Sequence, residues 1–145
     1  MATRTARTAW NGDLQNGSGQ VELTSSEVGT FDVSFPKWTA DAADGTTSPE
    51  ELIGAAHSAC YSMALSAEIG RAGGTPQSLD VKADVTLSPD PAGGFRISEI
   101  ALTVRAEVEG LDADGFDKAA QAAKAGCPVS KALTGTTITL DAALE

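Results

Sequence analysis

The chain has 145 residues and a mass of 14.7 kDa, the size of one ordinary domain. Twenty acidic residues against ten basic ones give a net charge of −10 and a pI of about 4.4, which disfavours binding to nucleic-acid phosphates or to an anionic membrane. No run of about 20 apolar residues could span a membrane, and the first residues do not resemble a signal peptide. We therefore expect a single domain over residues 1–145 that is cytoplasmic and binds neither nucleic acid nor membrane.

The first third of the chain predicts a small antiparallel meander. Short segments with alternating apolar residues cover residues 5–10, 20–23 and 30–35, and turn-forming Asn, Gly and Ser residues separate them. Aromatic residues make up only 5% of the chain, so its core must consist mainly of small and aliphatic side chains. Such a thin core would gain from a partner subunit.

A long helix is predicted to begin at Pro49. Ser48 suits the N-cap, Pro49 the first helical position, and Glu51 the third, where it can complete a capping box with Ser48. Glu50 is left without a structural partner. Residues 52–70 carry no charge before Glu68 and are small or apolar nearly all round, so we expect the helix to be buried on every side, by a sheet and by another helix or subunit.

The second half predicts two long strands, a helix and a last strand. Residues 79–88 alternate as in a half-buried strand, and the next strand changes phase near Ser98 and Glu99, where a bulge is expected. Residues 112–125 form a helix, Pro128 opens a short helical turn, and residues 136–144 form the last strand. The order βββ-α-ββ-α-β indicates an α+β fold.

Two cysteines and one histidine are too few for the usual four-ligand zinc site within one subunit. Cys60 and Cys127 are therefore either inert core thiols or a redox pair. Cys127 precedes Pro128 at the start of a helical turn, which favours thiolate and makes Cys127 the more acidic thiol on this argument alone. His57 and Met63 each lie one turn from Cys60: His57 either activates the thiol or is a buried core imidazole, and Met63 packs or lines an apolar pocket.

Two segments carry a resemblance to a known family. Residues 47–66 (TSPEELIGAAHSACYSMALS) and 123–131 (AKAGCPVSK) resemble the two signature segments of the OsmC/Ohr family, the osmotically inducible protein C and organic hydroperoxide resistance proteins, OsmC subgroup. The AWNGD opening at residues 9–13 and the ITL segment at residues 138–140 extend the likeness over essentially the whole chain. Two long motifs in matching order are a specific signal.

The resemblance implies an intertwined homodimer with a long buried central helix and antiparallel sheets. It further implies a thiol-dependent peroxidase of oxidative or osmotic stress defence, which reduces organic hydroperoxides to alcohols without a metal or other cofactor. Cys60 matches the peroxidatic cysteine, Cys127 the resolving cysteine, and Glu50 the glutamate that orients an arginine beside the sulfur. A dithiol reductant, for instance a lipoylated protein, would reduce the Cys60–Cys127 disulfide. The alternative is a non-catalytic thiol redox sensor or stress-associated binding protein.

One departure from the family pattern concerns the arginine. The segment that should supply it reads FPKWT at residues 35–39, where Trp38 occupies the place and Lys37 stands beside it. Lys37 would supply charge but not the planar two-pronged hydrogen bonding of a guanidinium. Three alternatives stay open: Lys37 substitutes, the thiol is less activated, or another arginine reaches the site. The candidates are Arg4, Arg7, Arg71, Arg96 and Arg105.

Overall fold

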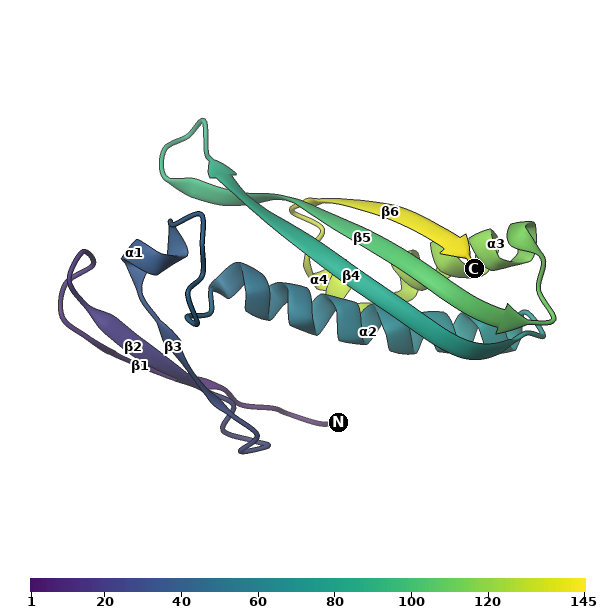
Figure 1. Cartoon of the computed structure of the whole chain (residues 1–145), viewed down its shortest axis with the longest axis horizontal. Coiled ribbons are helices and arrows are strands. Elements are labelled where there is room, and N and C mark those ends of the chain that lie inside the picture. The colour runs from purple at the N-terminus through teal and green to yellow at the C-terminus, as the bar shows by residue number, and fades with distance from the viewer. The chain divides into compact units, whose positions relative to one another are not determined.

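The computed structural model describes all 145 residues (Figure 1). Contacts between backbone positions divide the chain into two compact units, Met1–Leu52 and Ile53–Glu145, which are described separately below. That residues 1–145 act as one domain stays a prediction.

The first unit is the predicted antiparallel meander. Strands β1 (Arg7–Asn11), β2 (Ser18–Glu22) and β3 (Thr30–Val33) pair in that order. A short helix, α1 (Phe35–Trp38), which the sequence did not predict, follows β3. Pro at its second position and the extended backbone of Ser34 before it suit a helix start.

The second unit contains most of α2 and a three-stranded sheet with two further helices. The order β4-β5-β6 agrees with the predicted element order, and β4 and β5 pair antiparallel as expected. However, β5 and β6 pair parallel, because α3 and α4 connect them as a crossover. The bounds are α2 (Pro49–Arg71), β4 (Thr75–Pro89), β5 (Phe95–Glu109), α3 (Ala113–Gly126), α4 (Pro128–Ala132) and β6 (Thr137–Leu144).

The predicted bulge and helix caps are present. Thr86 pairs with Glu99 and Leu87 with Ile97, which leaves Ser98 as the extra residue of β5. At the start of α2 the Glu51 N–H donates to the Ser48 hydroxyl at 3.1 Å, as expected of the N-cap. The Glu51 carboxylate accepts from the Thr47 hydroxyl at 2.6 Å, so the second arm of the predicted capping box is replaced by a bond to Thr47.

Helix α2 packs on the sheet of the second unit through one stripe of residues. The buried members are Gly54, His57, Tyr61, Leu65 and Ile69. They contact the inward side chains of β5 and α3, which are Ile100, Leu102, Val104, Ala106, Phe116, Ala119, Ala120 and Ala123. A Cβ on Gly54 would lie 3.2 Å from the Ala83 carbonyl oxygen, so glycine lets α2 approach β4 closely.

The other side of α2 is exposed on a single chain. Its residues are small or apolar and without charge, and they are Ala55, Ala56, Ala59, Met63, Ser66, Ala67 and Gly70. One chain therefore buries one stripe of the helix against its own sheet, and burial of the other side by a second subunit stays a prediction.

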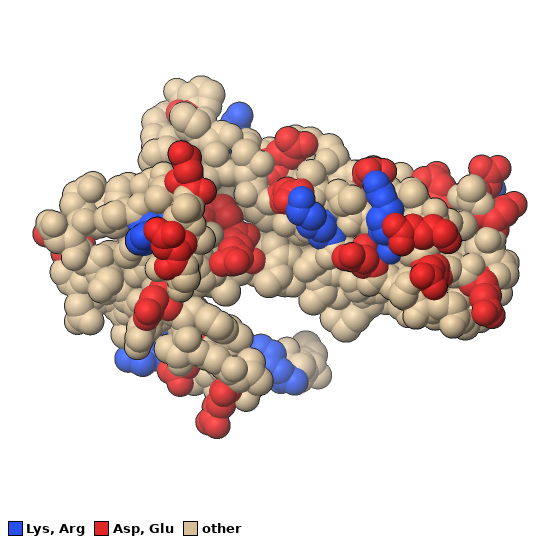
Figure 2. All heavy atoms as spheres, viewed as in Figure 1, with Lys and Arg blue, Asp and Glu red and all other residues tan.

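Acidic residues outnumber basic ones over the visible surface (Figure 2). None of the helices is both long enough and apolar enough to cross a lipid bilayer.

Candidate functional site

Two thiols from distant parts of the chain lie close enough in the second unit for each to affect the pKa of the other. Cys60 lies in the middle of α2 and is half-buried, whereas Cys127 joins α3 to α4 and is fully buried. Both are free thiols. A redox pair is thus geometrically available, and neither sulfur is an isolated core thiol.

Cys127 carries the more acidic thiol. Burial raises its pKa, but the N–H groups of Val129 and Ser130, the Ser130 hydroxyl and the Cys60 thiol together outweigh burial and lower the pKa below 9.0. The sequence argument from the start of α4 gave the same direction.

Cys60 carries the more accessible thiol. Burial raises its pKa, the Val129 N–H lowers it, and the Cys127 thiol raises it further, so that the pKa lies above 9.0. A negative charge on Cys127 opposes a second one on Cys60, so the pair shares one thiolate. Of the two sulfurs only that of Cys60 belongs to a residue with exposed surface.

His57 and Ser130 lie beside this pair in the buried interior. Nε2 of His57 is 2.7 Å from Oγ of Ser130, and both residues are buried. Burial lowers the pKa of His57 below 6.5, so its imidazole is neutral at neutral pH. The sequence analysis missed Ser130, although its place three residues after Cys127 on a short helix was a usable signal, because residues at that spacing share a face.

Tyr61 is fully buried, like His57. Its hydroxyl donates to the Ala120 carbonyl at 2.9 Å, which ties α2 to α3. Burial, with smaller effects from the charges of Cys127 and Asp117, raises the pKa of Tyr61, so the phenol stays protonated.

The remaining predicted site residues of the first unit form a separate polar group. The indole Nε1 of Trp38 donates to a carboxylate oxygen of Glu50 at 2.6 Å. Glu50 therefore has a hydrogen-bond partner. That partner, Trp38, is the residue that stands in the place of the family arginine. The ammonium of Lys37 pairs with Asp44 at 2.6 Å. Its charge is thus balanced within the same unit.

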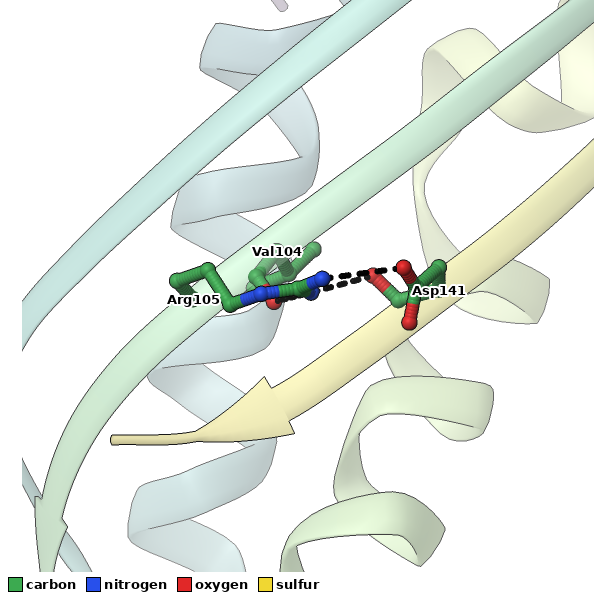
Figure 3. A network of polar contacts seen from close by, with 3 residues as sticks. All are labelled: Val104, Arg105 and Asp141. Carbon is green, nitrogen blue, oxygen red and sulfur yellow. Dashed lines mark hydrogen bonds and ion pairs between the residues drawn. The ribbon is translucent and has the colours of Figure 1, made fainter.

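None of the five candidate arginines acts on the thiols in this chain. Arg105 lies on the outer side of the sheet, where its Nη2 pairs with the Asp141 carboxylate at 3.0 Å and its Nη1 donates to the Val104 carbonyl at 2.8 Å (Figure 3). The others bind nearby groups or are exposed: Arg4 donates to the Thr3 carbonyl, Arg7 pairs with Glu22, Arg71 pairs with Glu68, and Arg96 is exposed. No arginine or lysine contributes to the pKa of either thiol.

An apolar hollow of about 480 Å³ lies in the first unit. Trp38 lines it but no cysteine does, so a role of Trp38 in a substrate pocket beside Cys60 stays a prediction. Other lining residues are Trp10, Leu14, Val21, Phe35 and Leu52. Met63, also predicted to line a pocket, is 69% exposed on the single chain.

The fold and the paired thiols define an α+β dithiol protein. The chain belongs to the OsmC-like protein family, whose sequence profile matches residues 42–141. It is 48% identical over 136 residues to Peroxiredoxin OsmC of Escherichia coli (strain K12), covering 94% of this chain and 92% of that protein. It is 30% identical over 125 residues to the organic hydroperoxide resistance protein OhrA of Bacillus subtilis (strain 168), covering 85% and 84%. The resemblance noted in the sequence is confirmed.

Solved structures confirm the predicted fold class. The crystal structure of the organic hydroperoxide resistance protein OhrB of Bacillus subtilis superposes with a TM-score of 0.74 at 29% identity, covering 96% of this chain and 98% of that one. An organic hydroperoxide resistance protein from Elizabethkingia anophelis gives a TM-score of 0.78 at 26% identity, covering 100% and 98%.

Proposed function

We propose that this chain is a thiol-dependent peroxidase that reduces organic hydroperoxides to alcohols. The observation that carries the proposal is the neighbouring pair of free thiols, of which one belongs to a half-buried residue and the other to a fully buried one. The 48% identity to a protein named peroxiredoxin supports it. The proposal includes a cytoplasmic location, where thiols stay reduced.

In the first step the Cys60 thiolate attacks the outer peroxide oxygen, which releases the alcohol and leaves a sulfenic acid on Cys60. Cys60 is assigned to this step because its sulfur is the accessible one, although Cys127 is the more acidic. Because the two thiols are close neighbours, transfer of one proton from Cys60 to Cys127 places the thiolate on Cys60. The lower pKa of Cys127 favours a thiolate on that residue, but only a thiolate on an exposed residue can react with the peroxide.

In the second step Cys127 condenses with the sulfenic acid to a Cys60–Cys127 disulfide. An external dithiol, such as that of a lipoylated protein, then reduces the disulfide by exchange. No metal or organic cofactor enters this cycle. An alkyl tail bound in an apolar pocket gains about 0.8 kcal/mol per buried CH₂, which hydrogen peroxide cannot gain. His57, Met63 and Trp38 are proposed to contribute to that pocket.

The proposal also includes a homodimer. The exposed side of α2 is an uncharged strip of small and apolar residues, and the positions 56, 59, 63, 66 and 70 repeat at alternate spacings of three and four. That spacing suits packing against a second helix. A second copy would cover Met63 and place it in an apolar environment beside Cys60.

Glu50 is proposed to act at the active sites of the assembled dimer, with Trp38 as its hydrogen-bond donor in place of an arginine. Lys37 stays a proposed source of positive charge, although Asp44 balances that charge in the single chain. Within the second unit, the Val129 N–H is the one named group that lowers the pKa of Cys60.

Steady-state reduction of tert-butyl hydroperoxide with excess dithiol tests the function. We expect continuous turnover by the wild type, none by Cys60→Ser, and a single oxidation by Cys127→Ser. Full activity of Cys60→Ser would contradict the assignment. Hydrogen peroxide as substrate should be consumed more slowly, and equal rates would argue against the apolar pocket.

One observation favours a second candidate, a redox sensor or stress-associated binding protein. No cation acts on either thiol in the chain, so Cys60 lacks the activation that rapid turnover needs. A sensor would consume about one equivalent of peroxide per chain in the same assay and then stop.

A further inference from the structure

The Ser130 hydroxyl contacts His57 and belongs to α4, the short helix that begins directly after Cys127. It is 2.7 Å from His57 Nε2, and the Ser130 side chain lowers the pKa of Cys127. These three residues come from α2, α4 and the junction of α3 with α4, and all three are buried. The hydroxyl hydrogen of Ser130 can point toward His57 Nε2 or toward the Cys127 sulfur. If His57 donates to the Ser130 oxygen, the hydroxyl hydrogen is free to point at the sulfur.

The histidine decides that direction. Nδ1 of His57 is buried and has no hydrogen-bond partner, so only Nε2 links the ring to its surroundings. Since burial keeps the ring neutral, one nitrogen carries the hydrogen and the other does not. With the hydrogen on Nε2, the ring donates to Ser130 Oγ and the serine hydrogen is free to point at the Cys127 sulfur. With the hydrogen on Nδ1, Ser130 donates to Nε2 instead, and a buried N–H is left without an acceptor.

The geometry points to a further catalytic residue and its positioning residue for the second step: Ser130 donates a hydrogen bond to the Cys127 thiolate as it attacks, and His57 holds the Ser130 hydroxyl in that direction. This inference rests on the proposed function, because it concerns the condensation of Cys127 with the Cys60 sulfenic acid. In that step a sulfur–sulfur bond forms and the sulfur–oxygen bond of the sulfenic acid breaks. The leaving hydroxide takes up the proton that Cys127 gives up, so that one water is released.

His57 is assigned to positioning rather than to carrying a proton. Accepting a proton would turn the buried ring into an imidazolium, which its burial opposes. No carboxylate contributes to the pKa of His57, and none contributes to that of Cys127. Tyr61, from the same helix, already donates its hydroxyl to Ala120. The neutral imidazole thus acts on the sulfur only through Ser130.

Ser130 is not the sole group that stabilises the thiolate. The N–H groups of Val129 and Ser130 stay in place when the hydroxyl is removed, because they belong to the backbone. The expected effect is therefore that of one hydrogen bond to a charged group, about a tenfold loss of rate.

The test separates the two chemical steps. The protein is oxidised with one equivalent of tert-butyl hydroperoxide, Cys60 sulfenic acid is quantified with a 1,3-dione trap, and disulfide formation is followed by peptide mass mapping against time and pH. In Ser130→Ala we expect sulfenic acid to form as in the wild type, and disulfide formation to slow by about tenfold with its pH midpoint raised. Ser130→Thr, which restores the hydroxyl, should recover the rate and the midpoint.

The histidine is tested by a matched pair of variants. His57→Gln keeps an N–H donor for Ser130, whereas His57→Leu removes it, so we expect the leucine variant to behave like Ser130→Ala and the glutamine variant to lie nearer the wild type. A Ser130→Ala protein that forms the disulfide at the wild-type rate with an unchanged pH midpoint would overturn the inference. So would equal slowing of both steps, which indicates a structural role.

Failure of the proposed function and failure of the inference about Ser130 would give different results. If the wild type formed no sulfenic acid, the peroxidase proposal would fail, while the role of Ser130 could still be measured as the pH midpoint of the ultraviolet absorbance of the Cys127 thiolate, which does not depend on access by a reagent. Compared with Cys60→Ser alone, the Cys60→Ser/Ser130→Ala double variant should show a raised midpoint. An unchanged midpoint there would overturn the inference independently of peroxide chemistry.

Discussion

The indole N–H of Trp38 donates to the carboxylate of Glu50 at 2.6 Å. The resemblance to the family places an arginine at this position, and tryptophan replaces its charge by a neutral donor. Glu50 keeps a hydrogen bond but loses a counter-charge. The nearest lysine in sequence, Lys37, is paired with Asp44. Within the first unit, the Glu50 carboxylate is therefore bonded to a neutral donor and not to a cation.

Trp38→Arg should restore the missing charge. A guanidinium paired with Glu50 and directed at the thiols of the dimer would lower the pKa of Cys60, and we expect alkylation of Cys60 at neutral pH to become about tenfold faster. Turnover of tert-butyl hydroperoxide should rise in parallel. Iodoacetamide labelling with peptide mass analysis measures the first effect, and the steady-state assay measures the second.

Trp38→Phe is the matched control for this prediction. It keeps an aromatic ring for the edge contact with Phe35, whose centroid lies 5.6 Å away, but removes the N–H donor. It should not accelerate Cys60. If the phenylalanine and arginine variants changed the rate equally, the effect would come from loss of the indole, and the role given to charge would be wrong.

The two thiols should change acidity in opposite directions when the partner is removed. In Cys127→Ser, Cys60 loses the neighbour that raises its pKa by hydrogen bonding and charge, so its midpoint should move to lower pH. In Cys60→Ala, Cys127 loses the side-chain donor that lowers its pKa, so its midpoint should move to higher pH. The ultraviolet absorbance of the remaining thiolate against pH measures both shifts, including that of the buried Cys127. Two midpoints that move together would contradict the shared thiolate.

Local patterns in the sequence predicted most of the fold. Alternation placed the strands, the Ser48–Pro49 signal placed the start of α2, and a change of phase located the bulge at Ser98. The parallel pairing of β5 with β6 was not predicted, because strand direction depends on how α3 and α4 cross over and not on alternation.

The candidate site was predictable only in part. Helix position alone gave Cys127 the lower pKa, and the structure agrees because the Ser130 and Val129 N–H groups face the sulfur. Ser130 was missed because its importance depends on contact with His57, which is far away in the sequence. The Trp38–Glu50 bond was missed for a different reason. A departure from a motif shows which residue is absent, but it does not show which side chain donates the hydrogen bond instead.

The exposed side of α2 predicts how the chain assembles. Ser66→Glu places a charge in the uncharged strip that we propose as the dimer contact, and a buried unpaired charge opposes association. We expect light scattering to show dimers for the wild type and mainly monomers for this variant at micromolar concentration. Ala92→Glu, at an exposed turn between β4 and β5, is the control and should stay dimeric. A dimeric Ser66→Glu protein would place the contact elsewhere.

Burial of His57 predicts an acid-sensitive stability. The folded state holds the pKa of His57 below the 6.5 of the unfolded chain, so the unfolded state binds more protons as the pH falls through 6.5. The contribution of the neutral ring is complete above pH 6.5 and is lost below it, with a slope of at most about 1.4 kcal/mol per pH unit. Asp13 and Asp44, whose pKa values lie below 3.8, lose their contributions only at more acid pH.

Urea unfolding at about pH 7.5 and about pH 5.5 measures this loss, because only histidine titrates in that range at its ordinary pKa. His57→Gln removes the titrating group but keeps a polar side chain beside Ser130. The variant should be less stable than the wild type at the higher pH, since the packed imidazole is lost, but its stability should change less between the two pH values. An equal loss in both proteins would mean that His57 takes up its proton without unfolding, and that the neutral ring on which the role of Ser130 depends is not maintained.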